Sequence, residues 1–217
     1  MHKIKVMLVD DHAVVRMGFK LLLQACEDIA VVAEADSGEA ACQACEQALP
    51  DVVVMDLAMT GIGGIEAIKR LVAKHPQIRV LALSAHEDTS YSKRAFQAGA
   101  LGYLSKRTAP EVLVDAIRLV AQGKRFIDPG IAQRMAMQDL SGETDPLALL
   151  SPREFEVFMQ IARGQSVVAV AETLNLSVST VGTHVHKIKQ KLELTNTSEI
   201  TLLALRQGLI DASGLGG

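Results

Sequence analysis

Two hydrophobic periods alternate along the first 122 residues of the chain. Short apolar runs, typical of strands buried in a parallel sheet, are separated by longer stretches with helical periodicity. The expected strands cover residues 4–9, 31–35, 52–55, 80–83 and 100–104, and the expected helices cover roughly 13–26, 38–48, 64–74, 88–98 and 110–121. Five such β–α repeats predict an α/β fold for residues 1–123, a doubly wound five-stranded parallel sheet.

The pattern changes twice in the second half of the chain. Residues 124–148 combine one short amphipathic helix with the polar stretch SGETDP, and they predict a linker. Residues 149–211 show helical periodicity alone, with a Ser-Pro-Arg-Glu helix start at residues 151–154. Two short helices then follow around a tight turn, which is the helix-turn-helix pattern. We therefore expect a second, all-α domain of four helices and a flexible tail at residues 212–217.

Composition narrows the class of protein. A net charge of −3 over 217 residues argues against a whole-protein polyanion binder, so any nucleic-acid contact must come from a local patch. No apolar run approaches the roughly 18 residues of a membrane span, and the acidic residues Asp10 and Asp11 lie close to the N-terminus, so we expect a cytoplasmic protein without a membrane partner. Cys42 and Cys45 form a C-x-x-C, but the surrounding pattern is helical and a second pair for zinc is missing from the sequence.

Polar side chains follow the expected strands at their carboxyl ends. Asp10 and Asp11 follow the first strand, and Asp56 ends the third. In a sheet of order 2-1-3-4-5 these strands are neighbours, so the three carboxylates should converge. A hard cation such as Mg²⁺ would relieve their repulsion. Ser84 and Lys106 end the fourth and fifth strands, and the set can bind a phosphoryl group placed on Asp56.

Six segments of this chain resemble a known family. The first domain is similar to the receiver domain of two-component response regulators in VDDH (9–12), MDLAMTG (55–61), LSAHE (83–87) and GYLSK (102–106). The second domain resembles the LuxR-type DNA-binding domain of the NarL/FixJ family in LSPRE (150–154) and LSVSTVGTHVHKIKQKL (176–192). Within that family, the first domain and the linker are most similar to the GacA/UvrY-like regulators.

The resemblance implies a role for each residue of the first site. Asp56 would be the phospho-acceptor, and the Mg²⁺ ligands would be Asp10, Asp11, Asp56 and the main-chain carbonyl of Ala58. Ser84 and Lys106 would contact the phosphoryl oxygens, and Tyr103 would be the aromatic residue that changes rotamer in the switch. The implied partners are a sensor histidine kinase, double-stranded promoter DNA, RNA polymerase and a second copy of the chain.

Two positions of the first site depart from the family or stay open. Thr60 stands where the family usually has proline, which should loosen the loop without removing a reacting group. His86 occupies a position that flanks the phosphoryl group in the family, and it is either a modulator of hydrolysis or an ordinary loop histidine.

A dehalogenase-type phosphatase is disfavoured, because Ala58 stands where its general acid would be. A dinucleotide loop is disfavoured because Glu66 replaces the last glycine of the fingerprint.

The third helix of the second domain carries the predicted DNA contacts. They are Thr180, Thr183, His184, His186, Lys187, Lys189 and Lys191. Residues 151–217 contain six Lys or Arg and six Asp or Glu, so the basic signal is local, and a solvated helix face is the alternative to insertion into the major groove. Gly182 stands where the family commonly has lysine, and His186 occupies another frequent contact position, so the target sequence cannot be transferred from a relative.

The whole pattern predicts a signalling switch that binds DNA, and not a conventional enzyme. Phosphorylation of Asp56 would control DNA binding and transcription, with dimerisation on phosphorylation or on DNA. The alternative is a DNA-binding regulator that does not depend on phosphorylation and uses the first domain for dimerisation or docking.

Overall fold

The computed structural model describes residues 3–85, 89–141, 146–207 and 209–210. The chain folds as two compact units, residues 1–142 and 143–217. His86 and the whole of the expected tail (212–217) therefore lie outside the described residues.

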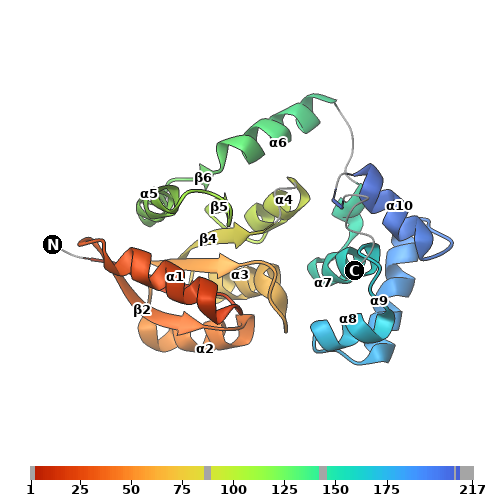
Figure 1. Cartoon of the computed structure of the whole chain (residues 1–217), viewed down its shortest axis with the longest axis horizontal. Helices are drawn as coiled ribbons and strands as arrows, with labels where there is room; N and C mark the ends of the chain where they lie inside the picture. Colours follow the sequence, from red (N-terminus) through yellow and green to blue (C-terminus); the bar gives the residue numbers. More distant parts are fainter. Residues whose placement is uncertain (1–2, 86–88, 142–145, 208, 211–217) are drawn as a thin grey trace. The chain divides into compact units, whose positions relative to one another are not determined.

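The first unit is built around a parallel sheet whose strands run in the order β2-β1-β3-β4-β5-β6. Its strands are β1 (Ile4–Val9), β2 (Ile29–Ala35), β3 (Val52–Asp56), β4 (Arg79–Ser84), β5 (Gly102–Ser105) and β6 (Phe126–Ile127). The helices are α1 (Ala13–Gln24), α2 (Gly38–Ala48), α3 (Gly63–Lys74), α4 (Thr89–Gln97), α5 (Pro110–Ala121) and α6 (Pro129–Ser141) (Figure 1). The doubly wound parallel fold predicted from the sequence is confirmed.

The sheet has one strand more than the five predicted, and the prediction was wrong on this point. The extra strand, β6, lies in the segment expected to be a linker and pairs with β5 through Gly102↔Phe126 and Tyr103↔Ile127. A strand of two residues is too short to produce a periodic signal. The following helix, α6, packs on α4, where the Thr89 hydroxyl donates to Gln138 Oε1 at 2.5 Å.

Helices cover both faces of the sheet and leave its carboxyl edge open. On one face, α1 and α5 bury a continuous core with alternate residues of β1, β3 and β4 (Figure 1). The second face is covered by α2, α3 and α4. Two helices of this unit begin with residues typical of helix starts: the Ser37 hydroxyl accepts from Ala40 N at the start of α2, and Pro110 occupies the first turn of α5.

The second unit is helical throughout its described part. It consists of a short 3₁₀ helix (Pro146–Leu149), α7 (Pro152–Ala162), α8 (Val167–Thr173), α9 (Val178–Lys191) and α10 (Ser198–Arg206). Serine hydroxyls cap α7, α8 and α9, from Ser151, Ser166 and Ser177. Phe155 and Phe158 of α7 are fully buried, and their rings stack with centroids 6.4 Å apart. The helix-turn-helix is formed by α8 and α9, joined through Asn175 in a left-handed conformation (φ 50°).

The described helices contain no segment that is both long and apolar enough to cross a membrane.

Candidate functional site

The ends of two adjacent strands bring three carboxylates together. Because β1 pairs with β3 in the register Val9↔Met55, Asp10 follows its strand beside Asp56. Asp10 and Asp56 are almost completely buried, whereas Asp11 is more accessible. Potential ligand atoms of Asp10, Asp11, His12 and Asp56 all lie within 4.8 Å of one another. We call the three carboxylates, together with Lys106, the acidic centre.

Lys106 supplies the positive charge of the acidic centre. It follows β5, and its ammonium lies 2.7 Å from Asp10 Oδ2 and 2.8 Å from Asp56 Oδ2. Its amide also donates to the carbonyl oxygen of Ser84 at 2.8 Å, which ties it to the end of β4. Burial acts to lower the pKa of Lys106, but the charges of Asp56 and Asp10 outweigh burial and raise the pKa above its usual value. The side chain therefore stays an ammonium ion at neutral pH.

The pKa of Asp56 is set by a different balance between burial and neighbouring charges. Burial raises the pKa of Asp56, and the attraction of Lys106 and a hydrogen bond from Ala58 N to Asp56 Oδ1 (3.1 Å) offset only part of this effect. The ionised carboxylate is therefore buried without full compensation. A group that bonds to this oxygen, or a cation beside it, would relieve that cost.

The oxygen atoms of the acidic centre match the preferences of a hard divalent cation. Asp11 Oδ1 and Asp56 Oδ2 are both buried, and the Lys106 ammonium lies 2.8 Å from Asp56 Oδ2. Mg²⁺ takes carboxylate and carbonyl oxygens as ligands, so these two atoms are suitable for it. His12 was missed by the sequence reasoning, and its Nδ1 lies 2.7 Å from Asp11 Oδ1. Its position in VDDH was the available signal.

Ser84 and Tyr103 lie on neighbouring strands and point to the same face of the sheet. The cross-strand pairs are Ala82↔Tyr103 and Ser84↔Ser105, so residues two apart on each strand share one face. Both Ser84 and Tyr103 are fully buried. Ser84 therefore lies on the same face as Tyr103 and nearer the carboxyl edge of the sheet.

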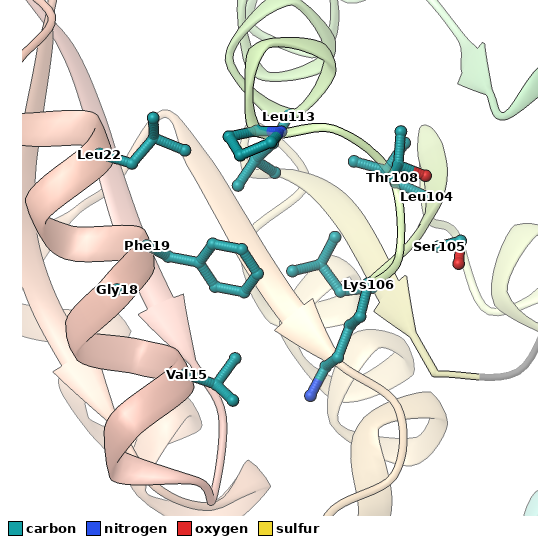
Figure 2. Close-up of a pocket in the computed structure, with 11 residues that line it drawn as sticks. Val15, Gly18, Phe19, Leu22, Leu104, Ser105, Lys106, Thr108 and Leu113 are labelled. Atoms are coloured by element: carbon teal, nitrogen blue, oxygen red, sulfur yellow. The ribbon is translucent and has the colours of Figure 1, made fainter.

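A cavity of about 420 Å³ lies between α1 and α5 near the acidic centre. Figure 2 shows Phe19 and Leu22 of α1 pointing toward Leu113 of α5, with the stem of Lys106 along the wall. Gly18 contributes to the opening, since a Cβ added there would meet no atom within 4 Å. The lining is mainly apolar.

The predicted DNA contacts on α9 divide into two groups. Thr183, His186 and Lys187 are exposed, on the side opposite the buried residues Val181, Val185 and Ile188. The other four are Thr180, His184, Lys189 and Lys191, and each is partly buried or engaged within the unit. Thr180 Oγ1 lies 2.7 Å from Ser177 Oγ at the helix cap, and the Lys191 ammonium lies 2.6 Å from Glu154 Oε2.

His184 faces the interior of the second unit. Its Nδ1 is buried and has no hydrogen-bond partner among the described residues. Burial lowers the pKa of His184, so the imidazole is neutral at neutral pH. By contrast, Gly182 is exposed and its missing side chain leaves open space. Helical spacing also places Ser179 and Gln190 on the exposed face, and the sequence reasoning did not include them.

Comparison with known families covers both units. Residues 6–118 match the model of the response regulator receiver domain, and residues 148–204 match that of bacterial regulatory proteins of the luxR family. The chain belongs to the two-component response regulators with a LuxR-type DNA-binding domain. The family predicted from the sequence motifs is thus confirmed.

Relatives match this response regulator over nearly its full length. It is 41% identical to the response regulator GacA of Pseudomonas syringae pv. syringae (strain B728a) over 97% of this chain and 99% of the relative. It is also 41% identical to the response regulator UvrY of Escherichia coli (strain K12), over 98% of both chains. A solved complex of the response regulator RcsB with DNA is 25% identical, with a TM-score of 0.60 over 94% of this chain and 98% of that one.

The raised pKa of Asp56 leads to a prediction for the response regulator without divalent ions. For an acid with a raised folded-state pKa, the contribution to stability is present at low pH and is lost as pH rises from 3.8 through the folded-state pKa. Asp56→Asn should therefore stabilise the receiver domain at neutral pH by about 1–3 kcal/mol, the cost of a buried polar group that is incompletely compensated. Denaturant unfolding in a chelator, followed by tyrosine fluorescence, measures the difference.

Both tyrosines of the chain, Tyr91 and Tyr103, lie in the receiver domain, and the sequence has no tryptophan, so this signal reports that domain alone. The stabilisation by Asp56→Asn should grow as pH rises. A variant that is less stable than wild type at neutral pH would contradict the argument.

Proposed function

We propose that a sensor histidine kinase phosphorylates this response regulator on Asp56, and that phosphorylation controls its binding to promoter DNA. The observation that carries the proposal is the acidic centre, in which a buried carboxylate with incomplete compensation lies 2.8 Å from an ammonium ion. Such a carboxylate can act as a nucleophile, because the neighbouring positive charge stabilises a transferred phosphoryl group. We further propose that the protein acts in the cytoplasm.

The transfer conserves atoms and charge. An Asp56 carboxylate oxygen attacks the phosphorus atom of a phosphohistidine; a P–O bond forms, the P–N bond breaks, and the imidazole leaves with its electron pair and takes up a proton. Lys106 would stay within reach of the phosphoryl oxygens and neutralise part of their charge. We do not assign turnover of phosphate esters to this centre, because the second residue after Asp56 is Ala58, which has no acidic side chain.

The residues that would hold Mg²⁺ are Asp10, Asp11, Asp56 and the main-chain carbonyl of Ala58. When bound, Mg²⁺ would supply positive charge that offsets the carboxylates and the incoming phosphoryl oxygens. Asp11 Oδ1 and Asp56 Oδ2 are buried, and potential ligand atoms of Asp10, Asp11 and Asp56 lie within 4.8 Å of one another, which supports this assignment.

The switch would run through Ser84 and Tyr103. The Ser84 hydroxyl is buried at the end of β4, within reach of the edge that carries Asp56 on β3. A new hydrogen bond from this hydroxyl to a phosphoryl oxygen would move the end of β4 and change the packing of the Tyr103 ring. A buried, close-packed aromatic ring has few alternative positions, so the response is a shift between two arrangements.

The surface of α1 suits the kinase partner. Val14, Met17 and Leu21 are exposed by 86%, 59% and 62%, and their spacing places them along one stripe of the helix. Exposed apolar stripes mark sites of protein contact. The cavity of Figure 2 is lined by residues of α1 and by Lys106, whose ammonium lies 2.8 Å from Asp56, so a kinase helix docked on α1 would bring its phosphohistidine close to the acidic centre.

The DNA-binding domain would place α9 in the major groove, with Thr183, His186 and Lys187 toward the DNA. The solved RcsB–DNA complex shows that a protein of this fold binds DNA. Two copies of the chain would read two half-sites, with the exposed side of α10, including Leu202 (52% exposed), as the dimer contact. RNA polymerase would be the further partner in transcription.

Intact mass spectrometry tests the phosphorylation proposal. Wild type, incubated with Mg²⁺ and a small phosphodonor, should gain one labile phosphoryl group, whereas Asp56→Asn should gain none. Absence of the gain in wild type would overturn the proposal and favour a DNA-binding regulator that works without phosphorylation.

Two lysines of α9 should respond differently to substitution. Lys187 is exposed, whereas the Lys191 ammonium pairs with the buried Glu154. Lys187→Ala should weaken DNA binding and reduce the slope of log K against log salt by about 0.9, the value for one phosphate contact, without changing stability. Lys191→Ala should instead lower the free energy of unfolding of the DNA-binding domain by about 1 kcal/mol. Salt titrations of DNA binding and hydrogen exchange of α9 measure the two effects. The assignment would be wrong if Lys191→Ala changed the salt slope and Lys187→Ala lowered the stability.

A further inference from the structure

The loop between β3 and α3 contains few residues that restrict its own backbone conformation. It carries Ala58, whose carbonyl is a proposed metal ligand. Two glycines with left-handed backbones lie near its end, Gly61 (φ 80°) in the loop and Gly63 (φ 73°) at the first residue of α3. Glycine loses more conformational freedom on ordering than any other residue. The N-cap of α3, Ile62, forms no side-chain cap hydrogen bond. The amide of Gly64 donates to the carbonyl oxygen of Leu57 at 3.3 Å across the loop, and contacts with other parts of the chain add to this local hydrogen bond.

Three alternate amides of the loop donate to three carboxylates. Ala58 N donates to Asp56 Oδ1 at 3.1 Å, Thr60 N donates to Asp11 Oδ2 at 3.4 Å, and Ile62 N donates to Glu39 Oε1 at 3.0 Å. The first two acceptors belong to the acidic centre. The third acceptor, Glu39, comes from the first turn of α2, where the Ser37 cap fixes the backbone.

Close packing at two glycines supports the contact between α2 and the loop. A Cβ on Gly61 would lie 2.6 Å and 2.7 Å from the carboxylate oxygens of Glu39, so this carboxylate occupies the space that a side chain would take. A Cβ on Gly38 would lie 2.7 Å from Cγ1 of Ile62, so the apolar side chain of Ile62 packs on the backbone of α2. The end of the loop is thus held by one polar and one apolar contact.

We propose that Glu39 is a positioning residue for the acidic centre: it fixes the end of the β3–α3 loop and so presents the Ala58 carbonyl to the metal ion. The inference rests on the proposed function for the identity of the metal site. Glu39 accepts a hydrogen bond from the Ile62 amide, so it would act on the Ala58 carbonyl through the loop backbone. Without it, binding of Mg²⁺ would have to order the loop, which weakens affinity.

Titration of the full-length protein with Mg²⁺, followed by tyrosine fluorescence, tests the role of Glu39. Glu39→Ala should weaken Mg²⁺ binding about tenfold, as removal of a supporting hydrogen bond around a metal site does. Glu39→Gln should stay within about twofold of wild type, because the amide oxygen can accept the same hydrogen bond. Glu46→Ala is the matched control, since Glu46 lies on the same helix and pairs with Lys74 away from the loop.

Hydrogen exchange of the Ile62 amide gives a readout that is independent of phosphorylation. Exchange should accelerate in Glu39→Ala and remain as in wild type in Glu39→Gln and Glu46→Ala. Equal Mg²⁺ affinity in wild type and Glu39→Ala would overturn the inference. Equal losses in Glu39→Ala and Glu39→Gln would also overturn it, because negative charge and not the hydrogen bond would then be responsible.

The two proposals fail in distinguishable ways. If wild type binds Mg²⁺ but gains no phosphoryl group, the proposed function is wrong, and the titration of the Glu39 variants still decides the inference. If wild type gains the phosphoryl group and the Glu39 variants bind Mg²⁺ equally, only the inference is wrong. If wild type binds no Mg²⁺, the inference is overturned.

Discussion

Lys106→Met is expected to lower the free energy of unfolding of the receiver domain by about 3 kcal/mol in the presence of a chelator. The substitution removes the ammonium that lies 2.7 Å from Asp10 and 2.8 Å from Asp56, and leaves two buried carboxylates without their shared partner. Methionine has a similar length and is apolar, so the loss comes from charge and not from packing. Denaturant unfolding followed by tyrosine fluorescence measures the change.

Three comparisons separate this electrostatic effect from a general loss of stability. Lys20→Met is the matched control, because Lys20 pairs with Glu34 at the surface and such pairs contribute about 0–1 kcal/mol. Saturating Mg²⁺ should restore part of the stability of Lys106→Met by supplying positive charge to the same oxygens. Adding Asp56→Asn to Lys106→Met should restore part of it without metal. Equal stability of Lys106→Met and wild type in chelator would contradict the assigned charge balance.

Glu154→Ala is expected to have the largest effect in the DNA-binding domain, a loss of about 2–3 kcal/mol in the free energy of unfolding. The buried Glu154 carboxylate accepts from Ser151 N at 2.8 Å in a capping box and pairs with the Lys191 ammonium at 2.6 Å. One side chain thereby joins the start of α7 to the end of α9. Its removal leaves a helix terminus and an ammonium without their acceptor.

The pH dependence of Glu154 follows from its pKa. Burial acts to raise the pKa of Glu154, but hydrogen bonds from Lys191 and Ser151 outweigh burial and lower it. For an acid with a lowered folded-state pKa, the stabilisation is present above the ordinary value of 4.5 and is lost as pH falls through the folded-state pKa. Glu154→Gln should therefore be less stable than wild type at neutral pH, and the difference should vanish in acid.

Hydrogen exchange of peptides from α7 and α9 measures the Glu154 variants, because the tyrosines lie in the other domain. Glu172→Ala is the matched control: Glu172 is exposed on α8, and its removal should change stability by at most about 0.5 kcal/mol. A Glu154→Ala protein with wild-type exchange would show that the capping box and the ion pair contribute little.

Much of the fold could be predicted because its signals are local. Alternating periods identify strands and helices, and the serines at positions 37, 151 and 177 cap helices through hydrogen bonds that span three residues. The convergence of Asp10 and Asp56 was also predictable, since it follows from strand order and from the position of each carboxylate at a strand end. The strand of residues 126–127 was missed because two residues carry no periodic signal.

The arrangement of side chains on α9 was harder to predict. The sequence shows Lys187, Lys189 and Lys191 as equivalent basic residues of one helix, and spacing alone does not say which of them meets another helix. The structure pairs Lys191 with Glu154, which is 37 residues away, and leaves Lys187 exposed. The choice depends on how α7 packs against α9, which is a property of the folded domain.

The sequence by itself determined the order of elements, their caps and the groups at the strand ends, because these depend on residues that are near one another or on a repeated period. Only the tertiary structure decided the partners of the long side chains: Lys106 with Asp10 and Asp56, and Glu39 with the loop amide of Ile62. The physical reason is that long charged side chains are flexible and can extend to several alternative partners. A flexible ammonium or carboxylate can pair with any opposite group within a few ångström, and the fold alone decides which groups come that close.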